Sequence, residues 1–127
     1  FWAFETDFGA VQGDFDTTDA LLTLAHDCRR PALFRPEALA AMELFAQGRW
    51  DTDGQGAWAG EIGQVQMLPA DILAHGFDGD GDGRVDLRGS AEDALWSAAR
   101  MLRSLGWRPG EPWLQEVTVP EGLDWSL

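Results

Sequence analysis

The 127-residue chain has the length of one domain or part of one, and its 45% apolar and 11% aromatic content is that of a globular rather than a disordered protein. A net charge of −13 disfavours nucleic acid and acidic membranes as partners, because both are negatively charged. No apolar run approaches the roughly 20 residues of a membrane span, and the single cysteine, Cys28, excludes an intrachain disulfide.

The first quarter of the chain predicts two helices. Residues 1–9 are typical of the end of an apolar helix that Gly9 stops. Thr17 or Thr18 is expected to cap a second helix that continues to Ala25, because a hydroxyl at this position can accept a hydrogen bond from a free backbone N–H.

The middle of the chain predicts two further helices and the loops between them. Pro36 suits the first turn of a helix, so the third helix is predicted over residues 36–47. A polar, turn-rich loop follows over residues 48–56. A short apolar turn over residues 58–67 then leads to a fourth helix that begins near Pro69.

The last third contains the strongest helix signal. An acidic, glycine-rich loop over residues 76–89 precedes Ser90, and Asp93 three residues later completes a capping box. The apolar spacing then predicts a helix over residues 90–105. Residues 116–119 are a short run that suits an extended chain. The predicted fold class is therefore mainly α, with little or no strand.

The acidic loop matches the first nine positions of an EF-hand calcium loop. Carboxylates at positions 1, 3 and 5 converge because Gly83 permits a sharp turn at position 6, and position 7 supplies a backbone carbonyl. Oxygen ligands suit a hard cation, and a flexible loop with many ligands favours calcium over magnesium. The predicted ligands at these four positions are Asp78, Asp80, Asp82 and Arg84.

Position 12 of this loop departs from the EF-hand pattern, because Gly89 replaces the bidentate glutamate. Glu92 and Asp93 lie three and four residues further on, and we expect Asp93 to close a longer loop. Six carboxylates among residues 78–93 face only two arginines and would repel one another without a counter-ion. We therefore predict one structural calcium ion, and the alternative is a solvated acidic turn that holds no ion.

Glu5 is the candidate catalytic acid. It lies in the apolar helical segment FWAFE, and apolar surroundings disfavour the ionised carboxylate, so its pKa is expected to rise towards the working pH of a general acid. The alternative is that Glu5 lies on a solvated helix face. Asp7 cannot share its face, because residues two apart on a helix point in different directions.

Four short motifs occur in order along the chain. ETDFG at residues 5–9 is similar to the pattern E-[ST]-x-[FWY]-G, and LTLAHDCRR at 22–30 is similar to LATLAYDxRR. GAWAGEIGQVQMLP at 56–69 resembles GSWAGAMGQxQFMPS, and residues 78–82 with 93–94 resemble a calcium loop. By these motifs the chain resembles the lysozyme-like lytic murein transglycosylases of the membrane-bound B type, glycoside hydrolase family 103.

The resemblance implies a lysozyme-like α fold with an EF-hand-like calcium loop, in which residues 1–127 are part of a catalytic domain truncated at both ends. Glu5 would protonate the oxygen that bridges N-acetylmuramic acid and N-acetylglucosamine in peptidoglycan. It would then accept the proton of the muramic C6 hydroxyl as that oxygen attacks C1. Because this nucleophile is internal, one carboxylate suffices and a 1,6-anhydro end results.

Three further residues are candidate substrate contacts. Gln66 corresponds to the glutamine with which the family contacts substrate, and the alternative is a loop amide that satisfies nearby backbone. Trp58 can stack on a sugar face or plug the core. Arg29 can hold a peptide-stem carboxylate, and a structural salt bridge is an equally open alternative.

Several positions depart from the family pattern. Ala57 stands where relatives often carry a serine that orients the catalytic acid, and His26 takes a usual tyrosine position. Glu61 replaces a small residue. It is expected either to lie in solvent outside the cleft or to face the cleft as another candidate substrate contact, where a second carboxylate would raise the pKa of Glu5.

These departures leave two alternative functions open. A hydrolytic muramidase on the same fold would use water, with Glu61 as the second carboxylate. A calcium-stabilised peptidoglycan-binding module would no longer cut. The expected partners are peptidoglycan glycan strands and other cell-wall enzymes. The resemblance places the protein in the periplasm, with a possible anchor to the outer membrane through a segment outside this sequence.

Overall fold

The computed structural model describes residues 1–49, 54–112 and 114–126. Within these ranges the chain forms five helices and one antiparallel pair of two-residue strands, in which Phe15 pairs with Gly56 and Asp16 with Gln55. The mainly α prediction with little strand is therefore confirmed. In chain order the elements are α1 (Trp2–Thr6), β1 (Phe15–Asp16), α2 (Thr17–His26), α3 (Pro31–Ala46), β2 (Gln55–Gly56), α4 (Pro69–His75) and α5 (Ala91–Ser104).

The predicted cap of α2 is wrong. The N-cap is Asp16, whose carboxylate accepts a 2.9 Å hydrogen bond from the backbone N–H of Asp19. Thr17 is already inside the helix, and its side chain is fully buried. Asp16 is the N-cap because the β1–β2 pair ends at this residue, which therefore keeps the extended backbone that an N-cap requires.

Helix α3 begins five residues before the predicted start. Pro31 occupies its first turn, where a missing N–H costs nothing, and Pro36 lies inside the helix. Pro36 has no N–H to donate to residue 32 and its ring crowds that carbonyl, yet the helix continues through it. The prediction for α5 is confirmed: Ser90 caps it by accepting a 3.3 Å hydrogen bond from the N–H of Asp93.

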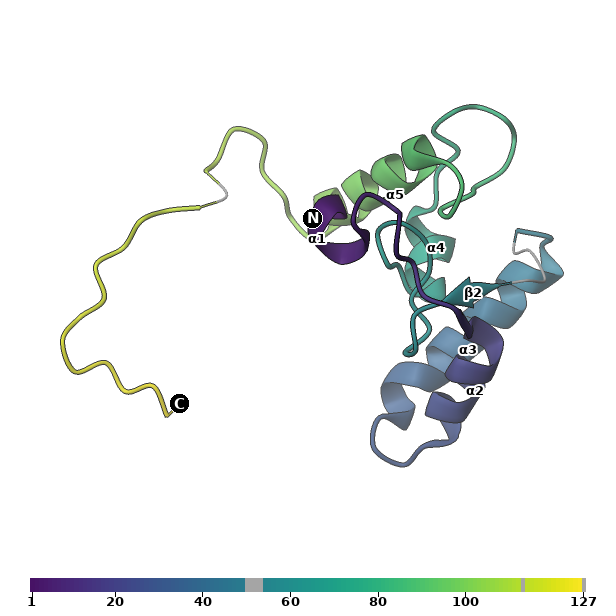
Figure 1. The fold of residues 1–127 in the computed structure, drawn as a ribbon, viewed down its shortest axis with the longest axis horizontal. Coiled ribbons are helices and arrows are strands. Elements are labelled where there is room, and N and C mark those ends of the chain that lie inside the picture. Colours follow the sequence, from purple (N-terminus) through teal and green to yellow (C-terminus); the bar gives the residue numbers. More distant parts are fainter. Residues whose placement is uncertain (50–53, 113, 127) are drawn as a thin grey trace.

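The core consists of two apolar clusters. One packs α2 against α3 and adds Ala59 from the following loop. The other packs the end of α3, α4 and α5 around residues 62–67 and takes Leu87 from the acidic loop. Figure 1 shows the α2–α3 pair on one side of the body and α5 on the other, with the loops between them.

The C-terminal tail leaves this body. Residues 107–126 extend away from α5 and form neither helix nor strand where they are described, so residues 116–119 pair with nothing as a strand (Figure 1). Trp125 is 78% exposed. Among the described residues, no helix combines the length and the apolar character that a membrane crossing requires.

Candidate functional site

A hollow of about 310 Å³ brings together four of the five predicted catalytic and substrate-contact residues. They come from α1 and from the loop that precedes α4, which are far apart in the sequence. Arg29 is the one predicted substrate contact that does not line it. The lining residues are Phe1, Glu5, Ala57, Trp58, Glu61, Val65 and Gln66.

Glu5 lies on the exposed face of α1, so the predicted apolar surroundings of its carboxyl are wrong. The helix has only five residues and packs with one face, from which Thr6 is fully buried. Phe4 points away and is 96% exposed, so it does not cover the neighbouring carboxyl. The Glu5 carboxylate therefore meets solvent and the open hollow.

Thr6 and Gln64, two residues that the sequence analysis did not single out, hold α1 in place. The Thr6 hydroxyl donates a 2.6 Å hydrogen bond to the backbone carbonyl of Gln64. The Trp2 indole N–H donates a 3.0 Å hydrogen bond to the Gln64 side-chain oxygen. A threonine next to the candidate acid and a glutamine two residues before Gln66 were the available signals. Neither signal indicates a buried contact, because threonine and glutamine side chains usually lie at the protein surface.

A tight turn presents Trp58 and Glu61 to the hollow. The Ala57 N–H donates to the Glu61 carbonyl at 2.8 Å, and the Gly60 N–H donates to the Ala57 carbonyl at 3.0 Å. Trp58 is 67% exposed, so it does not plug the core. Glu61 is half-buried and lines the hollow, as the cleft-facing alternative predicts.

Gln66 adopts the structural alternative, and its side-chain oxygen leaves the predicted substrate contact open. Its backbone adopts φ +53°, and its side-chain N–H donates to the carbonyls of Gly63 at 2.9 Å and Gln12 at 3.3 Å. These bonds satisfy nearby backbone, as the structural alternative requires. The side-chain oxygen has no hydrogen-bond partner among the described residues, so it is available to accept from a ligand in the hollow.

Arg29 takes the structural alternative. It lies in the turn between α2 and α3, where its guanidinium forms a 2.8 Å ion pair with Asp27. The hydrogen bonds from the Arg29 side chain and backbone lower the pKa of Asp27 to about 2. The pair is local and open to solvent, and Arg29 does not reach the hollow around Glu5.

The acidic loop brings together three of its predicted ligands. Carboxylate oxygens of Asp78, Asp80 and Asp93 lie within 4.8 Å of one another, a donor set that suits a hard cation. Asp82 is outside this group, and its carboxylate accepts a 2.8 Å hydrogen bond from the N–H of Arg84. The predicted closure of the loop by Asp93 thus agrees with the geometry.

Asp93 also organises the loop through hydrogen bonds. One oxygen accepts a 2.7 Å bond from the N–H of Gly79, and the other accepts a 2.7 Å bond from the N–H of Asp86. The residue is 1% exposed at the start of α5. It therefore ties both ends of the loop to that helix. The first oxygen also accepts a 3.3 Å hydrogen bond from the N–H of Asp80, so the oxygen that faces Asp86 is the one that keeps a lone pair for a cation.

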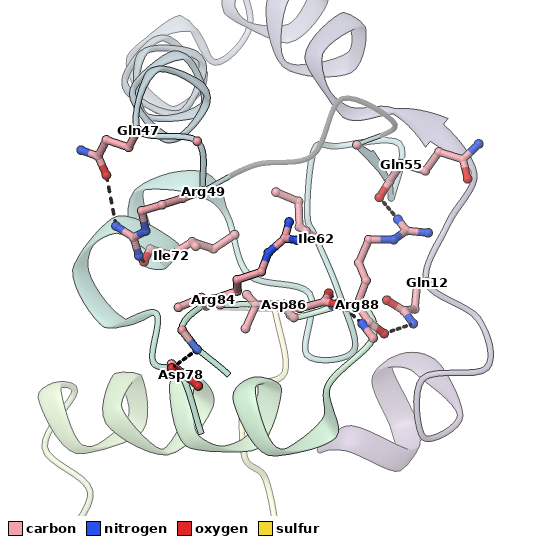
Figure 2. Close-up of a pocket in the computed structure, with 16 residues that line it drawn as sticks. Gln12, Gln47, Arg49, Gln55, Ile62, Ile72, Asp78, Arg84, Asp86 and Arg88 are labelled. Atoms are coloured by element: carbon pink, nitrogen blue, oxygen red, sulfur yellow. Dashed lines mark hydrogen bonds between the residues drawn. The ribbon is translucent and has the colours of Figure 1, made fainter. Parts of the chain in front are cut away.

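A larger cavity of about 700 Å³ lies between the end of α3, β2 and the acidic loop. Figure 2 shows the Arg88 side chain reaching the Gln55 carbonyl, while the Arg88 carbonyl accepts a 3.1 Å hydrogen bond from the Gln12 side chain. The Arg84 side chain extends into the cavity, away from Asp78 (Figure 2). Glu5 does not line this cavity, which the sequence did not predict.

Comparison with known proteins places the whole chain, residues 1–127, in the family described as Transglycosylase SLT domain. Membrane-bound lytic murein transglycosylase B of Escherichia coli K12 is 31% identical over 109 residues, which cover 84% of this chain and 30% of that protein. SltB3 of Pseudomonas aeruginosa, solved in complex with NAG-NAM-pentapeptide, matches with a TM-score of 0.85 and 38% identity over 97% of this chain and 33% of that one.

A second similar structure is Escherichia coli Slt35 in complex with calcium, with a TM-score of 0.81 and 29% identity. That match covers 87% of this chain and 36% of Slt35. The chain therefore spans about a third of the length of the relatives it matches.

Proposed function

Because this chain belongs to the Transglycosylase SLT domain family, we propose that it cleaves peptidoglycan as a lytic transglycosylase with Glu5 as its acid/base. The observation that carries the proposal is the single hollow lined by Glu5, Trp58, Glu61 and Gln66. It is supported by the similarity to SltB3, which was solved in complex with NAG-NAM-pentapeptide. By the same similarity, we propose action on the cell wall in the periplasm.

The proposed reaction needs one carboxyl group. Protonated Glu5 donates its proton to the oxygen that bridges C1 of N-acetylmuramic acid and C4 of N-acetylglucosamine, and the C1–O bond breaks. The C6 hydroxyl oxygen of the same muramic acid then bonds to C1 and loses its proton to the Glu5 carboxylate. This returns Glu5 to its starting state and leaves a 1,6-anhydro end. An internal nucleophile is already near its target, which supplies much of the rate.

The other residues of the hollow bind and orient the glycan. The exposed ring of Trp58 offers a flat apolar face for a sugar. The free side-chain oxygen of Gln66 accepts a hydrogen bond from a sugar hydroxyl or amide N–H. Arg29 is left out of this site, since Asp27 already pairs its guanidinium.

We further propose that the acidic loop binds one structural calcium ion. Asp78, Asp80 and Asp93 are its carboxylate ligands, because their oxygens converge and suit a hard cation. Asp82 and the Arg84 carbonyl follow in the loop as further oxygen ligands. The calcium complex of the relative Slt35 supports the assignment. The ion stabilises the loop against α5 and takes no part in the cleavage.

Mass spectrometry of digested murein tests the proposal, with the wild-type protein beside Glu5→Gln. Anhydromuropeptides from the wild type alone are the expected result. The glutamine variant keeps the shape of the side chain and cannot donate the proton, so a general-acid contribution of roughly 10²–10⁴-fold in rate should be lost. Unchanged melting temperatures of the two proteins would show that the loss is chemical.

Glu61 supports a second candidate, a hydrolytic muramidase. A second carboxylate in the same hollow could activate water, as in glycosidases that use two acids. The same digest separates the two, because hydrolysis leaves reducing ends in place of anhydro ends. Retained murein binding with no product from either protein would instead favour a binding module.

A further inference from the structure

Gln64 is the point at which the helix that carries Glu5 meets the acidic loop. It is 6% exposed, and both ends of its side-chain amide are used. The oxygen accepts from the Trp2 indole at 3.0 Å, and the nitrogen donates to the Arg88 carbonyl at 3.1 Å. We infer that Gln64 is a positioning residue that couples the orientation of Glu5 to the acidic loop, a role that rests on the proposed function of Glu5.

Helix α1 depends on this contact for its position. One and a half turns of helix are far too short to be stable on their own, so tertiary contacts must hold them. The Thr6 hydroxyl and the Trp2 indole both donate to Gln64, from either side of Glu5. Gly9 closes over the same side chain, since a Cβ there would lie 2.7 Å from the Gln64 oxygen. Moving Gln64 therefore moves Glu5.

The loop side of the contact leads to the buried carboxylate of Asp93. The Arg88 N–H donates to the Asp86 carboxylate at 3.0 Å, and the Asp86 N–H donates to the Asp93 carboxylate at 2.7 Å. The Arg88 carbonyl, held in this way, accepts from Gln64. A continuous series of hydrogen bonds thus runs from Asp93 through Gln64 to Trp2.

A parallel connection runs through Gln12. Its side-chain N–H donates to the carbonyls of both Arg88, at 3.1 Å, and Gly9, at 2.9 Å. This second connection joins the loop to the chain after α1. Among the described residues, the Gln64 side chain is hydrogen-bonded both to the loop and to the Trp2 indole of α1. Replacing Gln64 should therefore weaken the coupling strongly and leave the loop and α5 folded.

A double-mutant cycle tests the coupling without any metal and without turnover. The reporter is the indole N–H resonance of Trp2 in an NMR spectrum, assigned by its loss in Trp2→Phe. Asp93→Asn removes one carboxylate acceptor from the loop and should shift this resonance in the wild-type background. In the Gln64→Leu background the same substitution should shift it much less, because both side-chain amide contacts are gone and only the backbone bonds of residue 64 to Leu87 and Thr6 remain. Asp86→Ala is the second loop variant should Asp93→Asn fail to fold.

Kinetics on murein give the second readout. Gln64→Leu should lower kcat by about tenfold or more with KM within about twofold, because a misplaced acid weakens the transition state more than substrate binding. Phe34→Leu, in the cluster between α2 and α3, is the control for general destabilisation and should leave the ratio of kcat to KM close to that of the wild type.

Two results would overturn the inference. One is a Trp2 indole resonance that neither loop variant shifts in the wild-type background, and the other is a shift of equal size in the Gln64→Leu background. Absence of any murein product from the wild type would count against the proposed function alone, because the NMR cycle reports the coupling independently of cleavage.

Discussion

Glu61 lies in the same hollow as Glu5, so the hollow carries two carboxylates where the proposed reaction uses one. Glu61→Gln keeps the shape of the side chain and removes its ability to accept a proton. We expect anhydro products from this variant at a rate within about threefold of the wild type, because Glu5 remains. Any reducing-end product should fall by roughly 10²-fold, the usual contribution of a general base.

The ratio of anhydro to reducing ends, measured by mass spectrometry, checks this prediction. Glu116→Gln in the exposed tail changes the net charge equally and lies outside the hollow, so it is the matched control. Loss of the anhydro product in Glu61→Gln would assign Glu61 a part in the transglycosylase step itself.

The backbone conformation and close packing of Gly9 predict that an alanine there would destabilise the protein. Its φ is +89°, and a Cβ there would lie 2.7 Å from the Gln64 oxygen. Gly48 has φ +66° and nothing within 4 Å of the equivalent position. Gly48→Ala should therefore cost only the roughly 1–2 kcal/mol of a left-handed alanine, and Gly9→Ala should cost more, because the clash adds to it. Urea unfolding of the two variants measures the difference, and equal costs would contradict a tight contact at Gly9.

Between elements, a buried carboxylate joins α3 to α4. Glu37, 8% exposed, accepts a 2.8 Å hydrogen bond from the N–H of Ala70 in the first turn of α4. Burial raises the pKa of the Glu37 carboxyl above its ordinary value of 4.5, the nearby charge of Asp71 raises it too, and the Ala70 hydrogen bond lowers it. The folded state therefore holds this proton more tightly than the unfolded chain does.

The contribution of this group to stability is fully present below pH 4.5 and is lost as the pH rises through the folded pKa. We expect Glu37→Gln to match the wild type in acid and to become the more stable of the two towards neutral pH. Glu37→Ala should lose about 1–3 kcal/mol, because the Ala70 N–H is left without an acceptor. Unfolding free energies across this pH range check both predictions. A wild type whose stability relative to Glu37→Gln increases with pH would contradict the raised pKa of Glu37.

The start of α2 gives a matched pair of variants. Asp16→Ala removes the side-chain acceptor of the N-cap and should cost about 1 kcal/mol. Thr18→Ala removes a hydroxyl from inside the first turn, where no described hydrogen bond uses it, and should cost a few tenths of that. Thermal unfolding measures the loss of stability in each variant. A larger loss for Thr18→Ala than for Asp16→Ala would favour the threonine cap that the sequence predicts.

The start of a helix was predicted correctly where neighbouring residues determine it, and incorrectly where contacts between distant residues determine it. Ser90 and Asp93 specify the start of α5 between themselves, so the sequence was sufficient. The start of α2 depends on a strand pair between residues about 40 apart, which no local pattern reveals. The start of α3 differs from the prediction for another reason: Pro31 and Pro36 both suit a first turn, and the helix begins at the earlier of the two.

For the site as a whole, residue types were predictable and their surroundings were not. Glu5, Trp58, Glu61 and Gln66 were found from motifs, and the fold brings them to one hollow. The exposure of Glu5 depends on which face of a five-residue helix packs, and that face makes its contacts with residues distant in the sequence, such as Gln64. The larger cavity beside the acidic loop depends on three separated segments and carries no sequence signal.

The charge of the acidic loop yields a prediction whose sign depends on calcium. Without a cation, the carboxylates of Asp78, Asp80 and Asp93 repel one another, so Asp80→Asn should leave the melting temperature unchanged or raise it. With calcium at 100 times its dissociation constant, the wild type should gain about 2.7 kcal/mol, because only the folded loop binds the ion. Asp80→Asn should gain much less, since a charged ligand is missing.

Melting temperatures of both proteins, measured in chelator and in calcium, check this: Asp80→Asn should equal or exceed the wild type in chelator and lie below it in calcium. Magnesium should stabilise the wild type less than calcium does, because it demands a tighter octahedral geometry than a flexible loop provides. Glu116→Gln should gain as much from calcium as the wild type, which separates a specific site from the general attraction of cations to a chain of net charge −13. Equal gains for the wild type and Asp80→Asn would mean that the converging carboxylates form a solvated acidic turn and hold no ion.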